Sequence, residues 1–305
     1  MKLKNNKWVK VGLLVLTLVA FVYYFLQNQE QFGRIGNLTW WQVVLIVIGQ
    51  SIVFFSNILV SIIFIRFIGK KLHFLDSTRI TAYSSLVNFF GFLQGGVGLR
   101  GVYFKRHFEM SIKKYFGLTV IQYLFLFGVS GLFVLVGIAF TTGLSSAMFI
   151  AFAALIAAIL GFVLFGKTGA AKKIRTKLGA LNQLLQARPL AMLFAVIIVQ
   201  LCGSLLANFT ELQAIGADVS FGGLLIYTGT SQFAIVIALT PGAIGIREAL
   251  LLIVQQQMHL TTQDIVLAAT VDRVIYFITL ALITPFALAA KKQLPTKEIE
   301  EASAN

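Results

Sequence analysis

The sequence predicts an all-α integral membrane protein, a polytopic bundle of transmembrane helices that occupies almost the whole chain. Of its 305 residues, 58% are hydrophobic and only 12% are charged, whereas soluble domains carry about a quarter charged residues. Apolar runs of about 20 residues recur along the chain, and each is long enough to cross the hydrocarbon core of a bilayer. No polar stretch is long enough for a soluble catalytic module, so we expect one integral membrane domain over residues 1–296.

The apolar runs predict about six full spans and two re-entrant helical hairpins. The first span follows the basic N-terminal sequence MKLKNNKWVK and ends at about Leu26. It lacks the small-residue cleavage site of a signal peptide, so we interpret it as a transmembrane helix. The further spans are expected at residues 40–65, 115–140, 147–166, 189–212 and 265–290.

Two apolar regions, residues 80–99 and 222–258, do not fit a single crossing. Basic residues flank the first region on both sides, so both of its ends should be cytoplasmic. The second region has little charge at its ends, and the neighbouring spans place both ends outside. We therefore interpret the two regions as segments that enter the membrane from opposite faces and return. The alternative is a plain helical bundle with one badly placed basic loop.

The positive charge is confined to short blocks between the apolar runs. The net charge is +14, and all of the 25 Lys and Arg residues except Arg34, Arg247 and Arg273 fall in blocks that the spans place on one side. This distribution follows the positive-inside rule, and it excludes a nucleic-acid-binding surface as the reason for the charge. Both termini are then expected in the cytoplasm, with Arg34 outside and the other two arginines within the membrane.

The order of the segments suggests an inverted repeat, with halves at about residues 40–140 and 189–290. The linker between them, residues 167–188, places basic and apolar residues at helical spacing. It could form an amphipathic helix at the membrane surface or a helix packed on the bundle. The acidic tail, residues 297–305, is predicted to be disordered.

Cysteine and histidine residues predict neither a disulfide nor a metal site. The single cysteine, Cys202, cannot form an intramolecular disulfide, and His73, His107 and His259 are far apart and near predicted span ends. We therefore expect interfacial histidines, no cofactor and no metal. The sequence contains no nucleophile–base pair and no Walker motif, so no catalytic residue is assigned.

Two glycine-containing motifs end the two unusual regions. Residues 95–100 have the sequence GGVGLR, and residues 241–247 have the sequence PGAIGIR. With one gap, the motifs correspond at Gly96 and Gly242, Gly98 and Gly245, and Arg100 and Arg247. Many transporters contain inverted repeats with interrupted helices, and their substrate sites form where the repeats meet.

Irregular backbone at these glycines would have to line a wet cavity, because its polar groups cannot face lipid. A helix that begins after such a turn directs free N–H groups at the cavity, which suits a phosphate. Arg100 and Arg247 could add bidentate phosphate contacts. The alternative is that the glycines only permit close helix packing.

Further ionisable residues lie within apolar segments, where charge is costly and usually faces a partner or water. Glu248 follows Arg247, Asp272 and Arg273 are adjacent in the last span, and Glu211 lies near the outer end of its span. We expect the first four to line one polar cavity, with a purely structural ion-pair network as the alternative. The candidate substrate-binding residues are Asn88, Gly96, Gly98, Arg100, Glu211, Gly242, Gly245, Arg247, Glu248, Asp272 and Arg273.

These motifs resemble those of the lysylphosphatidylglycerol synthase transmembrane region family. TPGAIGIREALL at 240–251 is similar to its proline–glycine–x–x–glycine–x–x–glutamate motif, and residues 84–106 contain an asparagine, a glycine-containing turn and an arginine in the family's order. The resemblance covers roughly residues 8–290, although GGVG replaces the usual proline-bearing turn. It implies a bundle of about eight helical elements with internal repeats. In bifunctional members this region is thought to flip aminoacylated phospholipid, and a separate domain attaches the amino acid. We expect the flipping region without that domain.

The features together suggest a flippase or transporter that moves a phospholipid or lipid-linked headgroup across the cytoplasmic (inner) membrane of a prokaryote. The expected partner is an anionic phospholipid or lipid-linked substrate, with no nucleic acid, and a homodimer is left open. The alternative is a membrane-embedded (glyco)lipid or aminoacyl-lipid transferase or its accessory subunit. A third interpretation is a scaffold for another membrane protein.

Overall fold

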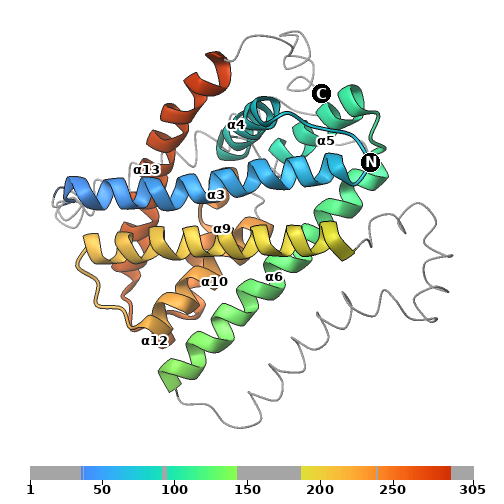
Figure 1. Cartoon of the computed structure of the whole chain (residues 1–305). Helices are drawn as coiled ribbons and strands as arrows, with labels where there is room; N and C mark the ends of the chain where they lie inside the picture. Colours follow the sequence, from blue (N-terminus) through green and yellow to red (C-terminus); the bar gives the residue numbers. More distant parts are fainter. Residues whose placement is uncertain (1–35, 37, 91–94, 143–186, 238–239, 290–305) are drawn as a thin grey trace, which may run out of the picture.

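The computed structural model describes residues 36, 38–90, 95–142, 187–237 and 240–289, and this part of the chain is helical without β-strands. Figure 1 shows helices that cross one another at several angles around a common centre. The all-α prediction is therefore confirmed. The expected first span, the span at 147–166, almost all of the linker 167–188 and the acidic tail lie outside the described residues.

Four described helices are long and apolar enough to cross a membrane, and they coincide with four of the expected spans. The helices are α3 (Trp40–Arg66), α6 (Ile112–Thr142), α9 (Ala187–Ala214) and α13 (Thr262–Ala289). A helix rises about 1.5 Å per residue, so each exceeds the roughly 30 Å of a hydrocarbon core.

The outward face of α6 shows why this helix suits a lipid environment. Phe116, Val120, Leu124 and Phe127 each expose more than half of their surface, and their spacing places them along one side of the helix. In water such an apolar stripe would promote aggregation, whereas in a bilayer it faces hydrocarbon. The opposite face of α6 packs into the protein through Leu118 and other buried residues.

Glycines allow two pairs of helices to pack at very short range. The helices α3 and α9 run antiparallel (Figure 1), and a β-carbon on Gly49 would lie 2.7 Å from the carbonyl oxygen of Gly203. The helix α6 packs in the same way on α10 (Phe221–Ile237), where a β-carbon on Gly137 would lie 2.5 Å from the carbonyl oxygen of Gly222. Such close backbone approach through small residues is typical of helix pairs in membranes.

The helices α4 (Phe74–Phe90) and α5 (Gly95–Phe108) form a helical hairpin whose two open ends lie together. Just before α4, the Lys70 ammonium donates a hydrogen bond of 2.8 Å to the Glu109 carboxylate, which directly follows α5. This hydrogen bond and the lysine charge lower the pKa of Glu109. The chain therefore leaves α3 and enters α6 at neighbouring positions.

A second hairpin consists of α10 and three short helical segments that follow it. These are η4 (Pro241–Ala243), α11 (Ile246–Ile253) and α12 (Gln255–Met258). Its open ends also meet, because a β-carbon on Gly223 would lie 3.1 Å from the carbonyl oxygen of Met258. The chain thus enters and leaves the 222–258 region at neighbouring positions.

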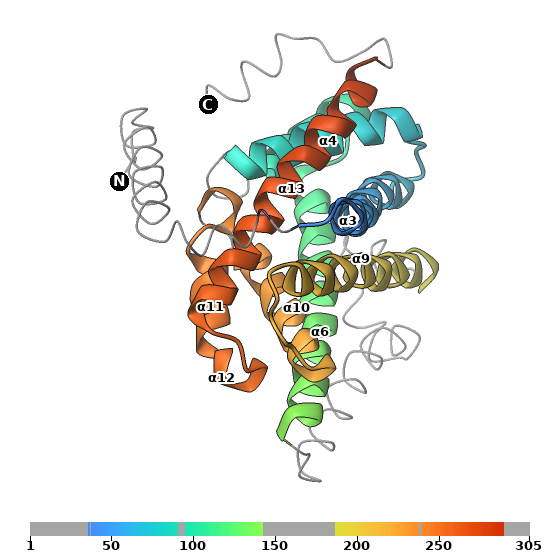
Figure 2. The ribbon, with the colours of Figure 1, turned by 90° about the vertical axis from the view of Figure 1, so that its left-hand side faces the viewer.

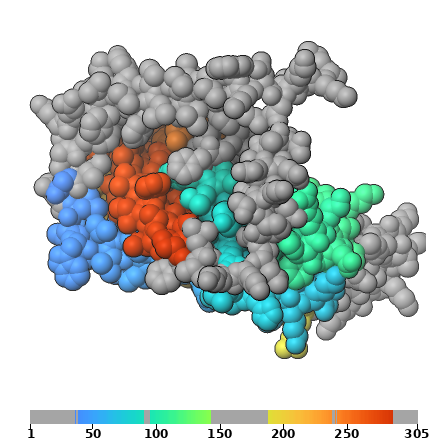
Figure 3. Space-filling view, turned by 90° about the horizontal axis from the view of Figure 1, so that it is seen from above, coloured from blue at the N-terminus to red at the C-terminus, as the bar shows by residue number. Residues whose placement is uncertain are grey.

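The described residues nearest to the turns of the two hairpins lie in contact. A β-carbon on Gly242, in the second hairpin, would lie 3.8 Å from the carbonyl oxygen of Phe89, near the end of α4. Figure 2 looks along the α3–α9 pair and shows α6 and α13 crossing it at steep angles. Figure 3 shows α13 beside the α4–α5 hairpin, and α13 indeed contacts α4. The α4–α5 hairpin therefore packs against the last long helix.

Candidate functional site

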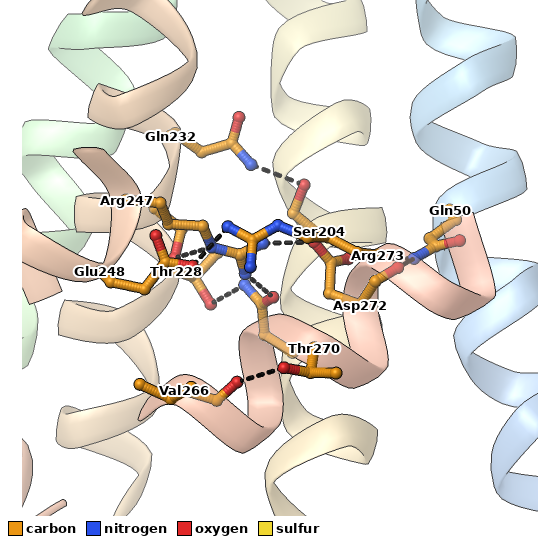
Figure 4. A network of polar contacts seen from close by, with 12 residues as sticks. Gln50, Ser204, Thr228, Gln232, Arg247, Glu248, Val266, Thr270, Asp272 and Arg273 are labelled. Carbon is orange, nitrogen blue, oxygen red and sulfur yellow. Dashed lines mark hydrogen bonds and ion pairs between the residues drawn. The ribbon is translucent and has the colours of Figure 1, made fainter. Parts of the chain in front are cut away.

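The second hairpin and α13 are joined by two parallel ion pairs. Arg247 of α11 pairs with Asp272 of α13, and the next residue, Glu248, pairs with Arg273. Figure 4 shows these side chains converging between α11 and α13. The sequence Arg-Glu on one helix therefore meets Asp-Arg on the other. The structure brings the four residues together as two ion pairs, and their lining of one polar cavity stays a prediction.

The turn before α11 explains how Arg247 and Glu248 reach this position. Gly242 and Gly245 have positive φ angles, a conformation that glycine adopts without the steric cost of a β-carbon. Ala243, between them, also has a positive φ angle. The Glu248 carboxylate accepts a 2.8 Å hydrogen bond from the Gly245 N–H. Glu248 thereby caps α11 and pairs with Arg273, so the cap and the ion pair fix the same side chain.

Arg247 contacts two further elements, α9 and α10, besides α13. Its Nε donates to the Ser231 hydroxyl on α10 at 3.3 Å, and its Nη2 donates to the Asn208 amide oxygen on α9 at 3.3 Å. The Arg247 guanidinium also lies 5.8 Å from the centre of the Tyr227 ring, within the range of a cation–π interaction. One side chain therefore links the second hairpin to two spans.

Asp272 is held from its other side by Gln50 of α3. The Gln50 amide donates to the Asp272 carboxylate at 3.0 Å and to its backbone carbonyl at 3.1 Å, and Gln50 accepts from the Thr279 hydroxyl at 3.0 Å. Sequence reasoning did not single out Gln50. Its only signal was a polar residue inside an apolar span, which is a common feature of helix contacts.

Glu211 is the one candidate residue that is both buried and unpaired. Its side chain has no exposed surface, and neither carboxylate oxygen forms a hydrogen bond of normal geometry. It lies close enough to Asp272 and Arg247 to interact with them electrostatically. The site thus contains three acidic side chains and two guanidinium groups.

Arg100 does not join this network, contrary to what its correspondence with Arg247 suggested. It lies on α5 in the first hairpin and forms no ion pair with the described acidic residues. Its Nε atom is buried without a hydrogen-bond partner. Its charge acts on Tyr123 of α6 and Tyr276 of α13, and Asp272 also acts on Tyr276. Tyr276 is therefore within electrostatic range of both Arg100 and Asp272.

The expectation of irregular backbone at residues 95–100 is wrong. These residues form the first turns of α5, and none of their glycines has a positive φ angle. At Gly96 a β-carbon would lie 2.0 Å from the Ser84 carbonyl oxygen, and the Gly96 N–H donates to the Asn88 side chain at 2.8 Å. Gly96 and Asn88 thus hold α4 against α5, while Gly98 faces open space. The packing interpretation applies to the first motif, and the turn interpretation to the second.

Metal binding receives no support from the part of the chain that the structure describes. Within that part, no group of three or more His, Cys, Asp or Glu side chains lies close enough to hold a metal ion. The contacts that the structure shows at the site are ion pairs and hydrogen bonds. Arg247 and Asp272 remain 12% and 24% exposed, so the network borders accessible space.

The helices and the buried charges define a polytopic α-helical membrane protein whose ion-pair network links a hairpin to its spans. The chain belongs to the lysylphosphatidylglycerol synthase TM region family, whose model matches residues 8–284. A search of curated proteins found no match. The family match and the four apolar helices indicate a multi-pass membrane protein of this family.

Proposed function

We propose that this protein moves a phospholipid or lipid-linked headgroup between the two leaflets of the cytoplasmic membrane. The observation that carries the proposal is the pair of hairpins, 74–108 and 221–258. In each hairpin the chain enters and leaves at neighbouring positions, and the two hairpins contact each other near their turns. A headgroup crossing a bilayer needs a polar path through hydrocarbon. The meeting point of two such hairpins offers one, as in many transporters.

The hairpins are re-entrant segments that approach each other from opposite faces of the membrane. Lys70 and Glu109, at the open ends of the first hairpin, are in direct contact, and both belong to segments whose basic residues favour the cytoplasm. In Figure 1 the end of α3 and the beginning of α9 lie on the same side of the molecule as these open ends. The open ends of the second hairpin lie at the beginning of α13, which is the outer face in this arrangement.

Arg100 is the phosphate contact in this proposal. Arg247 and Arg273 already have carboxylate partners, whereas Arg100 forms no ion pair with the described acids. A guanidinium in a protein stays charged and binds phosphate through two parallel hydrogen bonds. An unpaired guanidinium beside the hairpin tips therefore favours an anionic lipid as the ligand.

The direct test compares Arg100→Gln with the matched variant Arg106→Gln in reconstituted vesicles. Arg106 lies on the same helix but is exposed at its far end. A fluorescent anionic phospholipid is placed in one leaflet, and its exchange is followed with a membrane-impermeant quencher. Arg100→Gln should slow exchange by at least about tenfold, the effect of losing roughly 1.4 kcal/mol of binding, while Arg106→Gln should match the original protein.

Equal exchange rates in both variants would remove Arg100 from the proposal. Exchange no faster than in protein-free vesicles, with the original protein folded, would contradict lipid movement itself. The transferase alternative makes a different prediction, because the purified protein would then form a new lipid product. Mass spectrometry of the vesicle lipids in the same samples detects such a product.

A further inference from the structure

The charges of the ion-pair network do not balance. Arg247 and Arg273 each neutralise one carboxylate, Asp272 and Glu248 respectively. Glu211 is then a third acidic side chain without a cationic partner of its own. It is fully buried, and both of its oxygens lack a hydrogen-bond donor.

The groups that face Glu211 come from three helices. Arg247 on α11 attracts its negative charge, while Asp272 on α13 repels it. The Tyr227 hydroxyl on α10 also lies within electrostatic range, and it too is buried without a partner. The attraction of Arg247 is already shared with Asp272, which is ion-paired to it. An ionised Glu211 would therefore add an uncompensated charge at a fully buried position.

Burying an unpaired carboxylate costs several kilocalories per mole, and proteins avoid this cost by binding a proton or a cation. A metal ion has too few ligands here, since the described residues contain no acidic or histidine cluster suited to one. Two neighbouring carboxyl groups that face each other commonly hold one proton between them. A proton on Glu211 therefore restores neutrality with the fewest additional groups.

We propose that Glu211 is a proton-binding site, protonated in this conformation, and that its loss and uptake of a proton is coupled to lipid movement. This inference rests on the proposed function and adds the coupling ion to it. The coupling follows from the position of Arg247 on the second hairpin. A movement of this hairpin changes the distance of Arg247 from both Glu211 and Asp272, so hairpin position and proton binding are thermodynamically linked.

The proton assignment is tested by infrared difference spectroscopy of the intact protein in lipid at neutral pH. A protonated carboxyl group has a C=O stretching band that a carboxylate lacks. This band should be present in the original protein and absent in Glu211→Gln, which preserves the shape of a neutral side chain. The matched control Glu109→Gln, at an exposed carboxylate, should leave the band unchanged. If the band persists in Glu211→Gln, the assignment is wrong.

The coupling is tested in vesicles that carry a pH gradient, with the membrane potential clamped to zero. If one proton moves with or against each lipid, a gradient of one pH unit shifts the leaflet distribution of the lipid by about tenfold. The shift should vanish in Glu211→Gln, and its sign in the original protein separates symport from antiport. Rapid exchange without any shift in the original protein would overturn the coupling and leave lipid movement intact. Absent exchange would contradict the proposed function, and the infrared result would still decide the proton assignment.

Discussion

Arg247 connects four helical elements through a single side chain. It extends from α11, pairs with Asp272 on α13, and donates hydrogen bonds to Asn208 on α9 and Ser231 on α10. Guanidinium groups suit such a position, because their donors point in fixed directions and remain charged. A change at this residue therefore alters the contact between the second hairpin and both adjoining spans.

Removing only one member of the Arg247–Asp272 pair should cost more stability than removing both. Asp272→Asn leaves a largely buried guanidinium without its counter-charge, and the free energy of unfolding should fall by about 3 kcal/mol. The double variant Arg247→Met with Asp272→Leu should recover most of this loss, because well-packed apolar residues can replace a buried pair. Unfolding in lipid–detergent micelles measures both values, with Asp218→Asn in an exposed loop as control.

The same double variant separates a functional network from a structural one. If the network serves transport, the variant stays folded but loses lipid exchange. Full exchange by a stable double variant would show that the network only holds the helices together, which was the alternative stated from the sequence.

At the scale of single residues, the sequence indicated which charged residues meet but not which of them form ion pairs. Charge inside apolar segments was a sufficient signal to bring Arg247, Glu248, Asp272 and Arg273 together. Their pairing depends on the rotation of α11 relative to α13, which the turn at Gly242–Gly245 sets. The contact of Gln50 with Asp272 joins residues 222 positions apart, and no local pattern encodes such a distance.

At the scale of the elements, close glycine contacts predict where a single methyl group matters. A β-carbon on Gly49 would lie 2.7 Å from the Gly203 carbonyl oxygen, whereas one on Gly98 meets nothing within 4 Å. Gly49→Ala should therefore destabilise the protein by about 1–3 kcal/mol through overpacking. Gly98→Ala should stabilise it by up to about 1 kcal/mol, because alanine favours a helix. Thermal unfolding of the two variants measures the difference, and equal effects would contradict the close α3–α9 contact.

The long helices were predictable because apolar runs of that length form few stable structures other than transmembrane helices. The four described spans agree with the predicted ranges to within about three residues, the usual uncertainty of helix ends. The backbone conformation of residues 95–100 was not predictable from their glycines alone. Glycine permits both a turn and close helix packing, and only the contacts of Gly96 with α4 decide between them. At 241–245 the additional proline favoured a break.

At the scale of the whole molecule, the charge distribution and the hairpin geometry lead to the same arrangement. Basic residues on both sides of the 80–99 region required both ends on one face of the membrane, and the Lys70–Glu109 contact joins these ends in space. The meeting of the two hairpin tips was not predictable, because it depends on how the long helices cross.

Side-specific cysteine labelling in sealed vesicles of known orientation tests the central claim most directly. The native Cys202 is exposed, so it is first replaced by serine, and single cysteines are introduced as Lys71→Cys, Lys113→Cys and Asp218→Cys, all in loops or at helix ends. If residues 74–108 enter the membrane and return, an impermeant reagent labels Lys71→Cys and Lys113→Cys from the same, cytoplasmic face. Asp218→Cys should be labelled only from the opposite face. Labelling of Lys71→Cys and Lys113→Cys from opposite faces would show that the first hairpin crosses the membrane, and it would contradict the account.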